Sequence, residues 1–197
     1  MPPAKDVEKR FLSMLTANLI SLPFDLKVLY EAASDPNLER AAQETATGAI
    51  VYIISPNDII SDKNEAIGYT DDVIILRLAL KHILSVGGPD STGFHDRFAE
   101  VYDKLEEELG VYKEFLGELY DWLATKITAL PKQIFRSKTV KDYLDDEEAQ
   151  SFLYEEGLTF STDYRITERT LEGRLKRTDH IVDLLKRRRS EEAKKIS

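Results

Sequence analysis

Two apolar segments separated by a polar loop dominate the pattern of hydrophobic and polar positions along the chain. The first segment, 46–54, is apolar or small on nearly every side, and the second runs over 70–84. A helix that is apolar all round belongs in a protein interior, so both segments are predicted to be buried helices. Together they predict a buried helical hairpin over residues 38–86. Gly48, in the first segment, has no Cβ and lets another backbone approach closely.

A longer and more regular pattern follows the hairpin. Apolar residues recur at alternating steps of three and four from residue 93 to residue 130, which gives one apolar stripe of about five heptads. The phase of this stripe runs through Gly110 and Gly117, although each glycine weakens a helix by about 1 kcal/mol relative to alanine. We therefore expect one long amphipathic helix over 93–130; the alternative is a break at Gly110 that gives two antiparallel helices.

The patterns near the two ends of the chain are weaker. A helix is predicted over 7–22, with a shorter one restarting at Pro23. Toward the other end, a short helix is expected over 145–156. The alternating apolar positions of 158–166 suggest a minor extended segment. A last helix is expected from about Thr167.

These elements predict an all-α, mostly helical fold in which the buried hairpin packs with the long amphipathic helix. We expect a helical domain over 1–131, which contains the hairpin (38–86) and the long helix (93–130). Residues 132–197 are expected to form a C-terminal appendage with a basic terminal helix.

Charge divides the chain of 197 residues, whose net charge is -9, into two unequal parts. Eleven basic and six acidic residues lie between Arg165 and Lys195, so this tail carries +5 and the remainder carries -14. The densest basic run comprises Arg187, Arg188 and Arg189. Such a tail attracts nucleic acid, an anionic membrane, an acidic partner or the acidic body itself.

Composition also excludes several classes of site. The chain has no cysteine, which rules out disulfides and thiolate metal sites, and its three histidines make a His-rich zinc site improbable. No nucleophile elbow and no glycine-rich phosphate loop is present. The longest apolar run, 49–54, is too short to span a bilayer. The first residues lack an apolar signal core, and we expect a cytoplasmic protein.

The loop of the hairpin carries the sharpest candidate for chemistry. It places Asp58, Asp62, Asp71 and Asp72 within fifteen residues. Hard cations such as Mg²⁺, Mn²⁺ or Ca²⁺ take oxygen ligands of this kind, although the spacing is not that of an EF-hand. Alternatively, Asp58 and Asp62 accept backbone hydrogen bonds within the turn. Asp71 and Asp72 then place negative charge at the start of the second helix, where the helix dipole favours it.

The same stretch resembles the YkvA-like domain family, a short bacterial domain of unknown function. That family reads as an apolar helix, a Ser-Pro-x-Asp-x-x-Pro-Asp turn, a Gly-Tyr-x-Asp-Asp turn and a second apolar helix. The resemblance covers roughly residues 38–80, and Ser61 stands where the family usually has proline. The resemblance implies a structural element of the fold and no activity. The matching residues are Ser55, Pro56, Asp58, Asp62, Gly68, Tyr69, Asp71 and Asp72.

From these patterns we predict a non-enzymatic protein-interaction or scaffolding module. The long helix is expected to bury part of its stripe against a protein partner, a second copy or the C-terminal helix, with Leu116, Leu119 and Trp122 as interaction residues. The first alternative is a metal-dependent enzyme or metal-binding protein, whose cofactor would be a divalent cation held by the four aspartates. The second is binding of nucleic acid or an anionic membrane through the three tail arginines.

Overall fold

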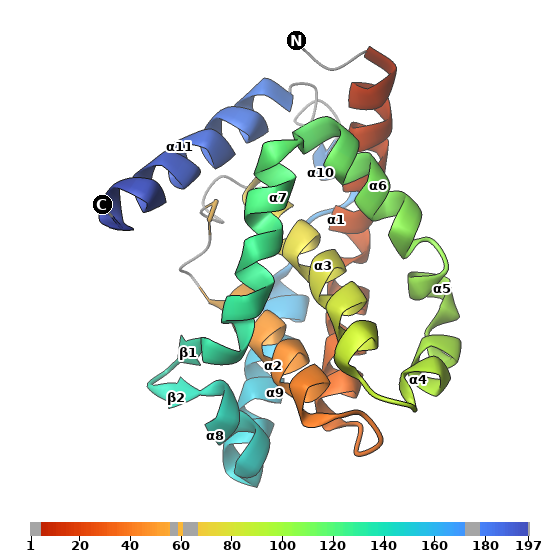
Figure 1. Cartoon of the computed structure of the whole chain (residues 1–197), viewed down its shortest axis with the longest axis vertical. Coiled ribbons are helices and arrows are strands. Elements are labelled where there is room, and N and C mark those ends of the chain that lie inside the picture. The colour runs from red at the N-terminus through yellow and green to blue at the C-terminus, as the bar shows by residue number, and fades with distance from the viewer. Residues whose placement is uncertain (1–4, 56–58, 61–66, 172–177, 197) are drawn as a thin grey trace.

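The computed structural model describes residues 5–55, 59–60, 67–171 and 178–196. The prediction of an all-α fold is confirmed: within this part of the chain one two-stranded antiparallel sheet accompanies the helices (Figure 1). The elements are α1 (Lys5–Ser34), α2 (Arg40–Ile54), α3 (Thr70–Val86), α4 (Ser91–Arg97), α5 (Ala99–Tyr102), α6 (Leu105–Leu116), α7 (Glu118–Ala124), the 3-10 helix η2 (Thr125–Lys132), β1 (Ile134–Phe135), β2 (Lys138–Thr139), α8 (Val140–Asp145), α9 (Glu147–Asp163), α10 (Glu168–Leu171) and α11 (Thr178–Ile196).

The predicted hairpin forms the centre of the molecule. Every residue over 45–53 on α2 and over 70–80 on α3 is buried. Figure 1 shows α3 between α1 and α7, and α1, α6 and η2 all pack against the hairpin. The backbone of η2 reaches α2 at Gly48, where an added Cβ would lie 2.1 Å from the carbonyl oxygen of Leu130. The close backbone approach expected at this glycine is therefore present.

Helix α1 is continuous from Lys5 to Ser34, so the predicted restart at Pro23 is wrong. Proline cannot donate a hydrogen bond to the carbonyl four residues earlier, which belongs to Leu19. In the structure the hydroxyl of Tyr164 donates to that carbonyl oxygen at 2.6 Å. A side chain from a distant part of the chain thus replaces the missing backbone bond and lets the helix run through the proline.

By length and composition alone, α1 is also long and apolar enough to cross a membrane. Core helices of soluble proteins meet the same criterion. In this structure one side of α1, including Phe11, Leu15 and Leu29, is fully buried against the rest of the chain.

The single long helix predicted over 93–130 is wrong. The segment forms α4, α5, α6, α7 and η2 in succession, and Gly117 separates α6 from α7 with a φ of +53°. Gly110 lies inside α6. The breaks let the apolar stripe bend around the hairpin, so that it is covered within the chain. Its buried members are Phe94, Val101, Leu105, Leu109, Tyr112, Leu116, Leu119, Leu123, Ile127 and Leu130.

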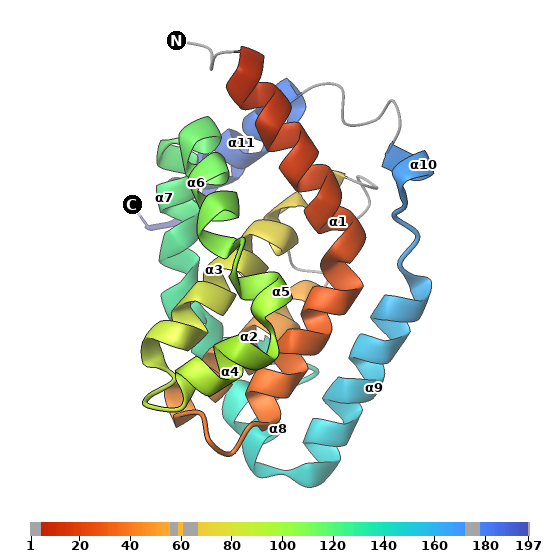
Figure 2. The same ribbon diagram turned by 90° about the vertical axis from the view of Figure 1, so that its right-hand side faces the viewer.

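The extended segment predicted over 158–166 is also wrong, because α9 continues to Asp163. Helix α9 runs beside α1 (Figure 2), and the two helices come into close contact where Tyr30 donates a hydrogen bond to the carbonyl oxygen of Leu153, at 2.8 Å. Beyond it, the described parts of the expected last helix are α10 and α11, and residues 172–177 lie outside the described residues. Helix α11 lies against α7 (Figure 1).

Candidate functional site

Asp71 joins both ends of the hairpin loop. Its side chain is fully buried, and its Oδ2 accepts hydrogen bonds from the hydroxyl of Tyr52 at 2.6 Å and from the backbone N–H of Ile59 at 3.0 Å. Its Oδ1 accepts from the N–H of Ile60 at 3.3 Å. Burial raises the pKa of Asp71 to about 7, although these three donors favour the ionised form. These hydrogen bonds therefore connect the loop to Tyr52 near the end of α2 and to Asp71 at the start of α3.

The rest of the carboxylate cluster is only partly described. Asp72 is fully buried beside Asp71 in the first turn of α3, as the helix-start interpretation expects. Asp58 and Asp62 lie outside the described residues. Within the part of the chain that the structure describes, no group of three His, Asp or Glu side chains is arranged to hold a metal ion.

The other motif residues line the ends of the two helices. Ser55 follows α2, and its N–H donates to the carbonyl oxygen of Tyr52 at 3.3 Å. Gly68 is buried. Tyr69 occupies the N-cap position of α3. Its ring packs against the rings of Phe160 and Tyr164, at centroid distances of 5.9 and 5.0 Å. Pro56 is outside the described residues. The described motif residues thus lie at the connection between α2 and α3.

A buried ionic network lies farther along α3 and was missed in the sequence analysis. Arg77 is 1% exposed, and its guanidinium contacts Asp25 at 2.8 Å and Glu108 at 2.5 Å. It also donates to the side-chain oxygen of Asn18 at 3.0 Å, and Asn18 in turn donates to the hydroxyl of Tyr112 at 2.7 Å. Burial opposes the charge of the guanidinium, but the two carboxylates outweigh it and raise the pKa of Arg77. The network joins α1, α3 and α6.

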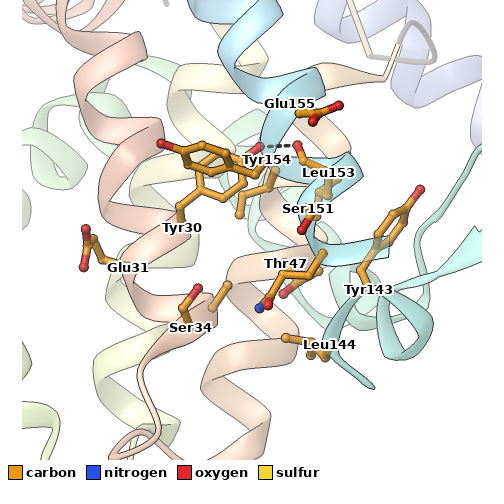
Figure 3. A pocket seen from close by; sticks show the side chains of 13 residues that line it. Tyr30, Glu31, Ser34, Thr47, Tyr143, Leu144, Ser151, Leu153, Tyr154 and Glu155 are labelled. Atoms are coloured by element: carbon orange, nitrogen blue, oxygen red, sulfur yellow. Dashed lines mark hydrogen bonds between the residues drawn. The ribbon is translucent and has the colours of Figure 1, made fainter. Parts of the chain in front are cut away.

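A pocket of about 500 Å³ opens on the other side of the hairpin, between α1, α2, α8 and α9 (Figure 3). Tyr30, Tyr143 and Tyr154 line it, together with Thr47 and Ile50 of α2, and we call this α2 side its floor. No local sequence pattern marks this pocket, since it forms between two helix pairs, α1–α2 and α8–α9, that are distant along the chain.

The predicted interaction residues lie on or near the face of α7 that α11 covers. Leu116 and Leu119 are buried, at 6% and 5% exposure. The indole N–H of Trp122 donates to Glu192 of α11 at 2.8 Å, and Lys126 pairs with the same carboxylate. Residues of the same chain therefore cover these side chains.

The tail arginines occupy different environments. Arg189 pairs with Glu118 of α7 at 3.1 Å, with both side chains largely exposed. The Nε of Arg188 donates to the carbonyl oxygen of Ile59 in the hairpin loop at 2.6 Å. Arg187 is exposed. Two of the three arginines therefore contact the acidic body.

The apolar contact that supports α11 is narrow, and polar contacts of Thr178, Arg188 and Glu192 add to it. Ile181 and Leu185, one turn apart, are fully buried, whereas residues 186–190 are exposed. A cavity of about 830 Å³ remains between α11, the start of α1 and the α6–α7 bend. Its lining residues include Glu8, Phe115, Leu116, Leu119, Val182 and Lys186. Helix α11 therefore covers this face without filling it.

Comparison with known families bears on the hairpin. Residues 45–78 match the family model described as "Protein of unknown function (DUF1232)". Over these residues the chain is similar to the DUF1232 family, and we call residues 45–78 the DUF1232 segment. This agrees with the resemblance to the YkvA-like domain. No curated protein and no solved structure matches the chain. The match runs from buried Thr45 to buried Leu78 and includes Asp71, so the DUF1232 segment supplies the core of this fold.

The DUF1232 segment should make stability depend on pH through Asp71. A carboxyl whose pKa is raised on folding favours the fold when protonated, and this stabilisation is lost as pH rises through the folded pKa. With a folded pKa of about 7, the loss between pH 5 and pH 8 is about 2–3 kcal/mol. Urea unfolding of wild type and Asp71→Asn at both pH values measures it. The wild type should lose more stability than the variant over this interval; equal losses in the two proteins would contradict the assignment.

The loop of the DUF1232 segment should not gain stability from divalent cations. Both oxygens of Asp71 already accept hydrogen bonds from the protein, which leaves this carboxylate a poor ligand. Adding Mg²⁺, Mn²⁺ or Ca²⁺ at millimolar concentration should leave the melting temperature unchanged. A rise of several degrees that disappears in Asp58→Ala would instead assign a cation to this loop.

Proposed function

We propose that the protein is a non-enzymatic interaction module, and that its binding surface is the face of α7 beneath α11. The observation that carries this proposal is the incomplete cover of that face. Helix α11 spans Thr178–Ile196, yet only Ile181 and Leu185 bury large side chains fully, and a cavity of about 830 Å³ remains beneath it. Apolar Phe115, Leu116 and Leu119 lie there among charged residues that include Glu8 and Glu118. A mixed surface of this kind that is covered but not filled is suited to exchange one helix for another.

The energetics of the α11 contact support displacement. Burying two aliphatic side chains contributes about 1.5–3 kcal/mol each, and exposed ion pairs such as Arg189–Glu118 contribute about 0–1 kcal/mol each. The two helical stretches of the DUF1232 segment, 45–53 and 70–78, are by contrast buried at every residue. Helix α11 can therefore leave the body while the hairpin stays folded.

The chemistry of α11 indicates the partner. Its apolar pair is followed by the basic run 186–189, and Glu118 of the body already pairs with Arg189. A partner helix with an apolar pair one turn apart and adjacent basic residues would make the same contacts. A second copy of this chain carries such a helix, and exchange of α11 between two copies would produce a dimer.

Trp122 offers a direct readout, because it is the only tryptophan and its indole contacts Glu192 of α11. A synthetic peptide of residues 178–196 is titrated into the intact protein and into the full-length variant Leu185→Glu, while Trp122 emission is followed. Leu185→Glu should release the chain's own helix and shift the emission to longer wavelength. The peptide should then restore the emission and bind at least about tenfold tighter than to wild type, since the surface is already open.

Ser190→Glu is the matched control, because it adds the same charge at an exposed position of α11. It should behave as wild type in emission and in peptide affinity. If Leu185→Glu remains folded by circular dichroism and neither shifts the emission nor binds the peptide, the face beneath α11 is not an exchangeable binding surface.

A further inference from the structure

The pocket between α1, α2, α8 and α9 has the size and lining of a small-molecule site. Its volume of about 500 Å³ falls within the range of ligand pockets, which is about 300–1,000 Å³. Ile50, Leu144 and Leu153 supply apolar surface, while Gln150 and Ser151 supply polar groups. The pocket shares no lining residue with the cavity beneath α11, so it is independent of the proposed interaction surface.

A polar group on the floor of the pocket is left unsatisfied. Thr47 is 1% exposed, and its hydroxyl has no hydrogen-bond partner among the described residues. Two residues earlier, the hydroxyl of Thr45 donates to the carbonyl oxygen of Ala41 at 2.8 Å, the usual arrangement for threonine in a helix. A buried hydroxyl without a partner is costly. A ligand that reaches the floor could supply the missing bond.

Aromatic rings form the walls. Tyr30 and Tyr154 meet edge to face, with centroids 5.4 Å apart, and Figure 3 shows the two rings together above the floor. The hydroxyls of Tyr30 and Tyr143 are engaged by the carbonyl oxygens of Leu153 and Phe135, each at 2.8 Å. These two tyrosines therefore offer a ligand mainly their rings, whose faces attract cations.

The charge around the pocket is negative. Glu31 and Glu155 stand at opposite edges (Figure 3), and no lysine, arginine or histidine is among the lining residues. The nearby cations Arg40 and Arg136 pair with Asp145 and Glu156, respectively. Burial raises the pKa of Tyr30, with smaller contributions from Tyr154 and Glu156, so its hydroxyl stays neutral. An anionic ligand would be repelled.

We infer that this pocket binds a small organic amine in its ammonium form, with an apolar body and a second polar group. The ammonium lies against the rings of Tyr30 and Tyr154 under the field of Glu31 and Glu155. The apolar body contacts Ile50 and Leu153, and the second polar group hydrogen-bonds to the hydroxyl of Thr47.

Three probes of nearly equal shape test the charge requirement on the intact protein. These are tyramine, which is cationic, tyrosol, which is neutral, and 4-hydroxyphenylacetate, which is anionic. Binding is followed by the amide shifts of Thr47 and Leu153 in isotope-labelled protein, with the indole signal of Trp122, which lies outside the pocket, as internal control. Tyramine should bind at least about tenfold tighter than tyrosol, and 4-hydroxyphenylacetate should bind most weakly.

Variants then assign the contacts. Glu31→Gln and Glu155→Gln should each weaken tyramine several-fold and leave tyrosol unchanged, whereas Glu107→Gln, at an exposed position of α6, should change neither. Thr47→Val should weaken tyramine but not phenethylamine, which lacks the phenol hydroxyl. Equal affinity for tyramine and tyrosol would overturn the inference, as would shifts confined to residues outside the pocket or no saturable binding by any probe.

Discussion

Replacing Arg77 with methionine should destabilise the protein by about 3–5 kcal/mol, because it leaves two buried carboxylates without their cation. Asp25 and Glu108 are each 2% exposed and both contact the guanidinium. Methionine retains much of the volume, so the loss reports the charge rather than a large cavity. Urea unfolding monitored by circular dichroism measures the difference.

A triple variant separates the charge from the packing. Arg77→Met combined with Asp25→Asn and Glu108→Gln removes all three charges and should recover a large part of the lost stability, since no isolated buried charge remains. A loss below about 1 kcal/mol in the single variant would mean that the network is not buried as the structure places it.

Replacing Gly48 with alanine should cost at least about 2–3 kcal/mol, although alanine normally favours a helix. The new Cβ would lie 2.1 Å from the carbonyl oxygen of Leu130 and 2.4 Å from its carbonyl carbon. Both atoms belong to the backbone of η2, so no side-chain rotation relieves the clash. Helix α2 and η2 must move apart, and thermal unfolding should show a lowered melting temperature.

Gly110→Ala provides the matched control. Gly110 lies inside α6, and nothing is within 4 Å of the position that its Cβ would occupy. The substitution should therefore stabilise the protein by about 0.5–1 kcal/mol. Opposite shifts for the two substitutions support the close contact between α2 and η2. A destabilisation of similar size in both would show that the clash does not determine the result.

The hairpin was predictable because its evidence is local. Two segments that are apolar on all sides require burial whatever surrounds them, and the close approach at Gly48 follows from the same pattern. The stripe over 93–130 was only half predictable. Periodicity identifies the residues that share a face, and these are buried as expected. It does not show whether the backbone is continuous, and the segment is divided into five successive elements. Of its two central glycines, Gly117, where φ is +53°, separates two helices, whereas Gly110 lies inside α6.

Two other errors have a tertiary cause. Pro23 predicts a helix restart because it cannot donate to the carbonyl oxygen of Leu19. The hydroxyl of Tyr164 donates to this oxygen instead. Over 158–166 the alternation of apolar residues is too short to distinguish a strand from a helix, and α9 extends through most of it because it packs along α1.

The candidate sites depended even more on distant contacts. The position of Asp71 at a helix start was readable from the sequence, whereas its hydrogen bonds to Ile59 and Ile60 were not. Arg77 gave a signal, a charge within an apolar helix, but its partners lie on α1 and α6. The tyrosine-lined pocket is assembled from four separate helices and had no local signature.

Hydrogen exchange of the intact protein tests the central claim, that α11 is a displaceable helix on a stable DUF1232 core. Amides of α11 should exchange through an opening of much lower free energy than those of α2 and α3. This opening should become easier with added salt, which screens the Arg189–Glu118 pair. If α11 amides exchange only together with those of the hairpin, and at a rate that salt does not change, the helix is an integral part of the core and the proposed surface is closed.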